Sequence, residues 1–359
     1  MASVKKYVIV TGGDGGYGNL GDEWLSAGVL SHYGGILKKY TVVMVIANIP
    51  KNRDERFMYV EDNPGAFDKL GIKVNDIAAL HYYGGGYLNT YWMDEKLWLY
   101  DHLITKGLPE DKVFFTGLGL GPLDDTSTGK LHELAEKVGE FGVRDRHYLN
   151  SIGGEFMFDE SIATITPKKS RRLGRKELWI NFRIASHVGA DEDKLVTLVK
   201  QLERFAKLYR LKVQYFAMID GKGFDERVEM IRVLKRCGIV NPQVHPRASS
   251  HFTLLSQFNH AALVITTSYH ATLAALYQGI PAVAVYENKY YDLKFTGVQD
   301  AFERTPLLQL MNLEHYKASD VVDAYMSRDD QIMEKVQKLK DYNTTVYENY
   351  QKTIGVTEL

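Results

Sequence analysis

The strongest constraint on the fold is a repeated pattern in which a short, continuous apolar run is followed by glycine and then by a helical stretch. Strands that alternate apolar and polar residues leave one face in water, whereas uninterrupted apolar strands are buried on both faces. The pattern therefore predicts a parallel sheet covered by helices on both sides, one of them at about 22–33. In the first half of the chain, the predicted strands are residues 7–10, 42–46, 78–83, 113–117 and 141–144.

The same pattern restarts after a basic stretch, residues 166–177, that holds six lysines and arginines and no apolar periodicity. We interpret this stretch as an exposed linker rather than a phosphate or membrane-surface patch, because runs of charge are usually solvated. Beyond it, the pattern predicts strands at 178–182, 213–217, 262–266 and 282–286, with helices at 192–209, 226–237 and 270–278.

Together these patterns predict an α/β protein with two successive doubly wound domains, residues 1–166 and 178–317. The C-terminal segment, residues 318–359, contains one long charged helix from about 318 to 350, which we expect to pack back across both domains. Ligands in doubly wound folds bind where the carboxyl ends of the strands meet their loops. We therefore expect the site in the cleft between the two domains.

The composition excludes several classes of protein. The 359 residues carry 44 Lys and Arg against 45 Asp and Glu, a net charge of −1 that lacks the basic excess of a nucleic-acid-binding protein. Cys237 is the only cysteine, which rules out an intrachain disulfide and suits a reducing compartment. No apolar stretch has the length of a secretory signal or a bilayer span, so we expect a soluble, cytoplasmic protein.

The first glycine-rich loop after a predicted strand, residues 15–23, ends in Asn19, Gly21, Asp22 and Glu23. It lacks both the G-x-G-x-x-G spacing of dinucleotide-binding loops and the terminal Lys-Ser/Thr of a P-loop. One interpretation makes Asp22 a helix N-cap and Glu23 a first-turn residue favoured by the helix dipole. The other makes them polar groups that hold substrate hydroxyls.

Two further glycine-rich loops follow predicted strands of the same sheet. Residues 82–89 include Gly85, Gly86 and Asn89, and residues 117–122 follow the next strand. Three consecutive glycines are entropically costly, so a tight turn or the close approach of a ligand must offset them. Glycine turns are common singly, but three at successive strand ends indicate a binding site.

Two arginines and a histidine also stand at predicted strand ends. Arg144 and Arg183 could each bind a carboxylate or phosphate through paired hydrogen bonds, although Arg144 could instead pair with Asp145 or another local carboxylate at the surface. His270 follows Ser268 at a predicted helix start and can exchange a proton near pH 7. A structural role for His270 is equally compatible with the spacing alone.

Other catalytic patterns are missing from the sequence. The histidines at 245, 251, 260 and 270 have no partners at metal-ligand spacing, and there is no G-x-S-x-G nucleophile elbow. We therefore expect neither metal-dependent nor serine-dependent hydrolysis, and no bound metal or cofactor.

Taken in order, these segments resemble the polysaccharide pyruvyl transferase family. The resemblance rests on GYGNLGDE, GGGYLN, GLGLGPL, VRDRHYLN, NFR and SYHATLAALYQGIPAVAV, and it spans nearly the whole chain. It implies a GT-B-like fold, with an acceptor-binding and a donor-binding Rossmann-like domain facing a cleft. It also implies transfer of a pyruvyl group from phosphoenolpyruvate to a sugar diol, which forms a ketal and releases phosphate without a metal.

The resemblance assigns roles to the residues already singled out. His270 is the candidate acid, or the group that stabilises the departing phosphate, and Asp22 or Glu23 would orient or deprotonate the acceptor hydroxyl. The candidate substrate-binding residues are Arg144, Arg183, Ser268, Asn19, Gly21, Gly85, Gly86, Asn89 and Lys289.

One departure from the family concerns the donor site. Many members have an arginine two residues before the histidine, where this chain has Ser268. The sequence offers Lys289, Lys294 or Arg247 as replacement cations, and leaves open whether phosphoenolpyruvate is the donor.

Two other functions fit the same features. A GT-B glycosyltransferase would use a nucleotide-sugar donor, with Glu287 as the carboxylate for the ribose. A non-catalytic carbohydrate-binding protein would keep the glycine loops and the aromatic residues. In each case we expect a carbohydrate partner and no nucleic acid. A lipid-linked acceptor would favour peripheral membrane association, and homo-oligomerisation is left open.

Overall fold

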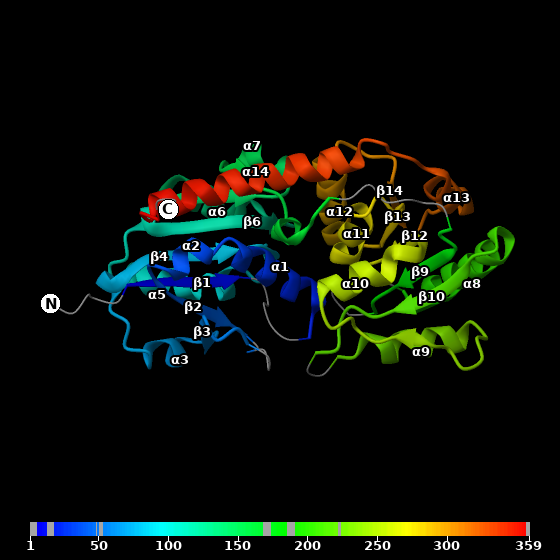
Figure 1. Ribbon diagram of the computed structural model, residues 1–359, viewed down its shortest axis with the longest axis horizontal. Helices are drawn as coiled ribbons and strands as arrows, with labels where there is room; N and C mark the ends of the chain where they lie inside the picture. Colours follow the sequence, from blue (N-terminus) through cyan, green and yellow to red (C-terminus); the bar gives the residue numbers. More distant parts are fainter. Residues whose placement is uncertain are drawn as a thin grey trace. The chain divides into compact units, whose positions relative to one another are not determined.

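The computed structural model (Figure 1) describes residues 6–12, 18–47, 49, 53–167, 174–184, 191–221 and 224–356, which form two compact units. Unit 1 contains Met1–Tyr17, Asp22–Ile165 and Lys338–Leu359, and unit 2 contains Gly18–Gly21 and Thr166–Gln337. The short segment Gly18–Gly21 belongs with unit 2, and the C-terminal segment is divided between the units. The domain bounds expected from the sequence stay a prediction.

Unit 1 is built on a parallel sheet whose strands follow the order β3-β2-β1-β4-β6-β7-β8, with β5 paired to β6 (Figure 1). Alternate residues of β1 enter different cores: Ile9 packs into one apolar cluster, and Val8 and Val10 pack into another. The continuous apolar character of these strands is therefore explained by burial on both faces. The strands are β1 (Tyr7–Gly12), β2 (Thr41–Ile46), β3 (Met58–Glu61), β4 (Ile77–Tyr83), β5 (Gly85–Leu88), β6 (Val113–Leu120), β7 (Glu140–Val143) and β8 (Glu155–Phe156).

Helices cover both faces of the unit 1 sheet. One core cluster includes apolar side chains of α5 and α6, and the other includes those of α1 and the C-terminal helix. The helices before the C-terminal segment are α1 (Leu20–Ser31), α2 (Gly34–Leu37), α3 (Pro64–Asp68), α4 (Met93–Lys96), α5 (Trp98–Thr105), α6 (Asp125–Lys137) and α7 (Leu149–Ile152).

Unit 2 contains a second parallel sheet, in the order β11-β10-β9-β12-β13-β14. Numbered within the unit, this is the 3-2-1-4-5-6 order of a Rossmann fold, in which the strand order reverses between β9 and β12 while the strands stay parallel. The strands are β9 (Glu177–Asn181), β10 (Lys212–Phe216), β11 (Val244–His245), β12 (Ala261–Thr266), β13 (Ala282–Tyr286) and β14 (Leu308–Asn312), and the helices between them are α8 (Glu192–Tyr209), α9 (Glu226–Arg236), α10 (His251–Gln257), α11 (Tyr269–Leu276) and α12 (Lys289–Ala301).

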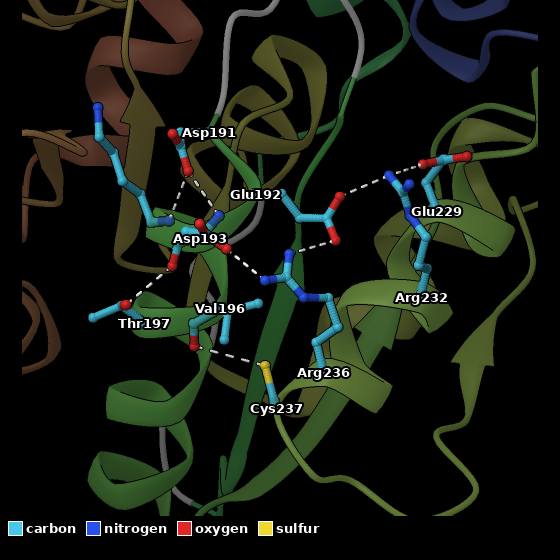
Figure 2. Close-up of polar contacts among 10 residues, drawn as sticks. Asp191, Glu192, Asp193, Val196, Thr197, Glu229, Arg232, Arg236 and Cys237 are labelled. Carbon is cyan, nitrogen blue, oxygen red and sulfur yellow. Dashed lines mark hydrogen bonds and ion pairs between the residues drawn. The ribbon is translucent and has the colours of Figure 1, made fainter.

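Helices α8 and α9 are joined by ion pairs at their solvent side (Figure 2). The Arg236 guanidinium contacts the carboxylates of Glu192 and Asp193 at 2.7 and 2.5 Å, and Arg232 contacts Glu192 at 2.9 Å. Asp191 accepts hydrogen bonds from the first-turn N–H groups of α8, which explains why the helix begins at the predicted residue. The cysteine, Cys237, lies beside this cluster and donates to the Val196 carbonyl.

The C-terminal segment contains two helices where one was predicted. Helix α13 (Ala318–Met326) belongs to unit 2, and α14 (Ile332–Thr353) contributes residues to both units. In unit 2, Asp329 between the helices accepts from Thr305 Oγ1 at 2.6 Å and pairs with Lys335. These contacts fix the chain between the helices, an arrangement that helical periodicity does not reveal.

Three sequence predictions meet limits or corrections in the fold. Helix α1 begins at Leu20 rather than near residue 22, so the interpretation of Asp22 as its N-cap is wrong. Most of the basic linker, residues 168–173, and residues 15–17 of the first glycine loop lie outside the described residues.

None of the helices in the described part of the chain is both long and apolar enough to cross a bilayer.

Candidate active site

The structure brings several predicted site residues together at the switch point of the unit 2 sheet. Asn181 at the end of β9 lies in register with Thr266 at the end of β12. Arg183 follows the first of these strands, and Ser268 and His270 follow the second. Loops that leave neighbouring strands in opposite directions open a crevice at this point, which is where doubly wound folds bind ligands.

Arg183 is held from two sides. Its Nε lies 3.5 Å from Oε1 of Glu226, and its backbone N–H donates to Thr267 Oγ1 at 2.9 Å. The Arg183 side chain is 17% exposed, whereas the Glu226 carboxylate is fully buried. The carboxylate can therefore fix the arginine in the loop while part of the side chain still reaches solvent.

Glu226 is the centre of a polar network that joins three strand ends. Its Oε2 accepts from Asn181 Nδ2 at 3.0 Å and from the Met218 N–H, and Asn181 Oδ1 accepts from Thr266 Oγ1 at 3.0 Å. Burial raises the pKa of the Glu226 carboxyl, and the positive charge of Arg183 opposes this shift. The sequence analysis missed this residue, whose only local signal is the acidic first turn of α9.

Ser268 and His270 open helix α11. Ser268 is its N-cap and accepts from the Ala271 N–H at 3.4 Å, while its own N–H donates to Thr266 Oγ1 at 2.9 Å. His270 is the second residue of the helix and is half-buried. The free N–H groups of a helix start favour an anion, so a histidine there lies close to where an anionic substrate would bind.

The segment Gly18–Gly21 lies against the same loops of unit 2. Asn19 forms a β-bridge with Ile219, and Leu20 N–H donates to the Met218 carbonyl at 3.0 Å. Gly21 packs on His270 so closely that a Cβ at position 21 would overlap the imidazole. Gly21 thus contributes to the site by leaving room for His270, and Asn19 Oδ1 accepts the Gly21 N–H at 3.0 Å.

Asp22 and Glu23 lie in the first turn of α1, directly after Gly21 in the chain. Both side chains are half-buried, and acidic residues in a first turn are stabilised by the helix dipole. The structure thus agrees with the interpretation of Glu23 as a first-turn residue that the helix dipole stabilises. A role of either carboxylate in the chemistry stays a prediction.

The candidate replacement cations differ in their surroundings. Arg247 pairs through Nε with Asp220 at 2.6 Å, and the Asp220 N–H donates to the Gly18 carbonyl at 2.8 Å. Lys289 is an exposed first residue of α12, and Lys294 lies over the Tyr290 ring at 4.2 Å. Arg247 is therefore linked, through Asp220, to the segment that packs on His270.

Two predicted substrate-binding residues of unit 1 have internal partners instead. The buried Arg144 guanidinium pairs with the buried carboxylate of Asp159, 15 residues further along the chain, at 2.6 Å. The arginine is thus paired with a carboxylate, but the pair lies in the interior and not at the surface, where the alternative interpretation placed it. Asn89 is also fully buried, and its Oδ1 accepts from the N–H groups of Tyr91 and Trp92. In the structure Arg144 pairs in the interior and Asn89 shapes its loop, and a part of either residue in substrate binding stays a prediction.

The glycine loop of unit 1 is tied to a second buried carboxylate, Glu160. Gly84 N–H donates to Glu160 Oε2 at 2.9 Å, and Oε1 accepts from Tyr347 Oη at 2.6 Å and from Thr116 Oγ1. Burial raises the pKa of Glu160 to about 8, against the lowering effect of these hydrogen bonds. Gly85 and Gly86 follow in β5, where their part in binding stays a prediction.

The network around Glu160 continues through a buried histidine. Thr116 donates to Glu160, so its oxygen accepts from His81 Nε2, 2.7 Å away, and His81 Nδ1 accepts from Tyr33 Oη. Burial lowers the pKa of His81 to about 3, which agrees with this neutral tautomer. The network connects β4, β6 and α14 in the interior of unit 1.

In the described part of the chain, no three His, Cys, Asp or Glu side chains lie close enough together to hold a metal.

Comparison with known families identifies the segment that carries the unit 2 site. Residues 157–289 match the family described as polysaccharide pyruvyl transferase, which confirms the resemblance over this part of the chain. The matched segment contains Arg183, Glu226, Ser268 and His270, and ends at Lys289. It does not include the glycine loops of unit 1. No protein of curated function matches the sequence.

Solved structures with the same architecture confirm the predicted GT-B-like fold. A putative UDP-N-acetylglucosamine 2-epimerase from Listeria monocytogenes has a TM-score of 0.57 at 9% identity, with 99% of this chain and 98% of that one covered. The Rickettsia bellii UDP-N-acetylglucosamine 2-epimerase has a TM-score of 0.55 at 13% identity, with coverages of 98% and 99%. A Polygonum tinctorium UDP-glucosyltransferase has a TM-score of 0.52 at 12% identity, and 99% of each chain is covered.

Proposed function

We propose that this chain is a transferase of polysaccharide biosynthesis that moves the pyruvyl group of phosphoenolpyruvate onto two hydroxyls of a sugar. The observation that carries the proposal is the convergence of Arg183, the start of helix α11 and His270 at the switch point of the unit 2 sheet. All three lie in the segment that matches the pyruvyl transferase family.

The donor carries a carboxylate and a phosphate, so its site needs fixed cations and N–H donors. Arg183 and the first-turn N–H groups of α11 supply both kinds of contact. Ser268 stands where many members of the family have arginine. Arg247 is our candidate for the second cation, because its partner Asp220 is hydrogen-bonded to the segment that packs on His270.

The reaction begins with protonation of the methylene carbon of phosphoenolpyruvate by His270, which leaves an oxocarbenium-like centre at the neighbouring carbon. One sugar hydroxyl adds to that centre and loses its proton. The second hydroxyl then forms the other carbon–oxygen bond as the bond to the phosphate oxygen breaks, and its proton goes to the departing phosphate. Asp22 or Glu23 is the candidate acceptor of a hydroxyl proton, and the products are a methyl-bearing ketal and hydrogen phosphate.

Phosphate release from phosphoenolpyruvate, measured over a panel of hexosides, tests the proposal. His270→Ala should lower turnover at least about 100-fold, because general acid catalysis contributes that much or more. His315→Ala, at an exposed position, is the matched control and should retain full activity. A His270→Ala protein that works within a few-fold of the parent would remove His270 from the chemistry.

A second experiment, thermal unfolding with added ligands, separates the glycosyltransferase alternative. A ligand at one hundred times its Kd stabilises a protein by about 2.7 kcal/mol, so thermal unfolding with phosphoenolpyruvate or a nucleoside diphosphate reveals which one binds. Stabilisation by the diphosphate, without phosphate release from phosphoenolpyruvate, would overturn the proposal. The structure favours pyruvyl transfer in one respect: Glu287, the expected ribose ligand, accepts from Lys194 Nζ and from the Asp191 N–H.

A further inference from the structure

An exposed tyrosine follows the glycine loop of unit 1 and has no role in the proposed chemistry. The side chain of Tyr91 is 70% exposed, more than Phe252 at 63% or Tyr342 at 43%. Single aliphatic residues at a surface are ordinary. A large aromatic ring is a different case, because its flat apolar face and polar hydroxyl suit contact with a ligand that is itself partly apolar and partly polar.

The backbone on both sides of Tyr91 is held in place from the interior. Buried Asn89 accepts the N–H groups of Tyr91 and Trp92 at 2.9 and 3.2 Å, and its Nδ2 donates to the Gly86 carbonyl at 3.0 Å. Every polar atom of this buried amide is therefore used to set the course of the loop. An aromatic residue that lies at the surface by chance needs no buried side chain to hold its backbone. The contacts of Asn89 therefore indicate that the position of the Tyr91 ring has a use.

Thr90 fixes the same loop to the next strand end. Its N–H donates to the Pro122 carbonyl at 3.1 Å, and its Oγ1 accepts the Asp124 N–H at 3.0 Å. Pro122 and Asp124 lie between β6 and α6, so the tyrosine belongs to the loops at the carboxyl edge of the unit 1 sheet. This is the edge at which doubly wound domains bind their ligands.

The Tyr91 ring is also supported by its neighbour. The Trp92 ring meets it edge-on, with centroids 6.1 Å apart and planes inclined by 60°. In such a contact Trp92 covers at most one face of the tyrosine ring, which agrees with the 70% exposure of Tyr91. Because the loop is already ordered, binding a ligand on this face would require little further loss of conformational entropy.

We propose that Tyr91, presented by Asn89 and Thr90, is a stacking platform for one pyranose ring of a carbohydrate ligand. A pyranose has one face on which several C–H groups converge, and this face matches the ring of tyrosine, while the hydroxyls at its rim remain available for polar contacts. The proposal that Tyr91 binds the acceptor sugar rests on the proposed function. The proposal that Tyr91 binds a carbohydrate does not depend on that function.

Saturation-transfer NMR with the full chain and a panel of methyl hexopyranosides tests the platform without any turnover. We expect at least one glycoside to bind, with strongest saturation on the C–H protons of one ring face. Tyr91→Ala should weaken its binding about tenfold, while Tyr91→Phe and Tyr91→Trp retain it. Phe252→Ala in unit 2 is the matched control and should bind like the parent.

The outcomes distinguish this proposal from the proposed function. Binding unchanged in Tyr91→Ala, or no binding of any glycoside to the parent, overturns the platform even if phosphate release is observed. Tyr91-dependent binding without phosphate release overturns pyruvyl transfer and leaves the platform standing. If both hold, Tyr91→Ala should raise KM for the sugar about tenfold with kcat and the KM for phosphoenolpyruvate within twofold of the parent.

Discussion

Glu160 in unit 1 and Glu226 in unit 2 are both fully buried carboxylates that accept a backbone N–H from a loop at a strand end of their own sheet. For Glu160 the donor is Gly84, after β4, and for Glu226 it is Met218, after β10. In both cases burial raises the pKa of the carboxyl. Their remaining partners differ in kind.

Glu160 is surrounded by neutral donors, the hydroxyls of Thr116 and Tyr347, and both come from inside unit 1. Glu226 also faces Arg183, which reaches solvent. The first arrangement joins a strand, a loop and the C-terminal helix into one core. The second fixes an arginine that binds the donor in the function we propose. Under that proposal, a buried glutamate stabilises unit 1 and a buried glutamate positions a binding residue in unit 2, and the difference lies in their partners.

The largest effect that this comparison predicts is on the stability of unit 1. Glu160→Ala leaves the Gly84 N–H and two hydroxyls buried without their acceptor, at about 1–3 kcal/mol each, so we expect a loss of about 4 kcal/mol. Thermal or urea unfolding measures this loss. The control is Glu348→Ala, an exposed position beside Tyr347, which should change little. Equal stability of the two variants would mean that the network does not hold unit 1 together.

The next effect is on the kinetics of unit 2. Arg183→Met should lower kcat/KM for phosphoenolpyruvate about 100-fold, because hydrogen bonds to charged groups contribute about 1.5–3 kcal/mol each. Glu226→Gln keeps the cation but loosens its position, so we expect about a tenfold fall, mostly through KM.

The double variant sharpens this test. It should be no worse than Arg183→Met, since Glu226 acts through that arginine; additive losses would contradict the assigned role. Arg232→Met in the exposed ion-pair cluster of Figure 2 is the matched control and should leave both constants unchanged.

The smallest effect is a difference in how stability depends on pH. The folded state raises the pKa of Glu160 to about 8, so it binds a proton that the unfolded chain releases near pH 4.5. That contribution is full below the unfolded pKa and is lost as pH rises through the folded one. Between pH 5 and 9 the parent should therefore lose a few degrees more in Tm than Glu160→Gln, which cannot ionise. Parallel curves would show that Glu160 does not titrate in this range.

Much of the candidate site could be predicted because its residues directly follow recognisable strands in the sequence. A strand followed by Asn-Phe-Arg, and a strand followed by hydroxyl residues and His270, were enough to place Arg183 and His270 at one sheet edge. Arg144 followed the same local pattern and proved to be an internal ion-pair partner of Asp159. The pattern fixes the strand end on which a side chain stands, but it does not indicate whether solvent reaches that side chain.

The residues that sequence reasoning missed are those whose partners are far away along the chain. Glu226 is 45 residues from Asn181, and Glu160 is 187 residues from Tyr347. Neither glutamate interrupts an apolar period, since each lies at the start of a helical turn where acidic residues are common. Nothing near them in the sequence shows that they are buried.

The sequence by itself determined the two parallel sheets, the helix Glu192–Tyr209 and the loops that could carry a ligand, because continuous apolar runs, caps and glycines act over a few residues. Tertiary structure alone decided that Gly21 makes room for His270 and that Gly18–Gly21 joins unit 2. The physical reason is that burial and pairing depend on which segments meet in space, and a polar side chain carries no local mark of the partner it will meet.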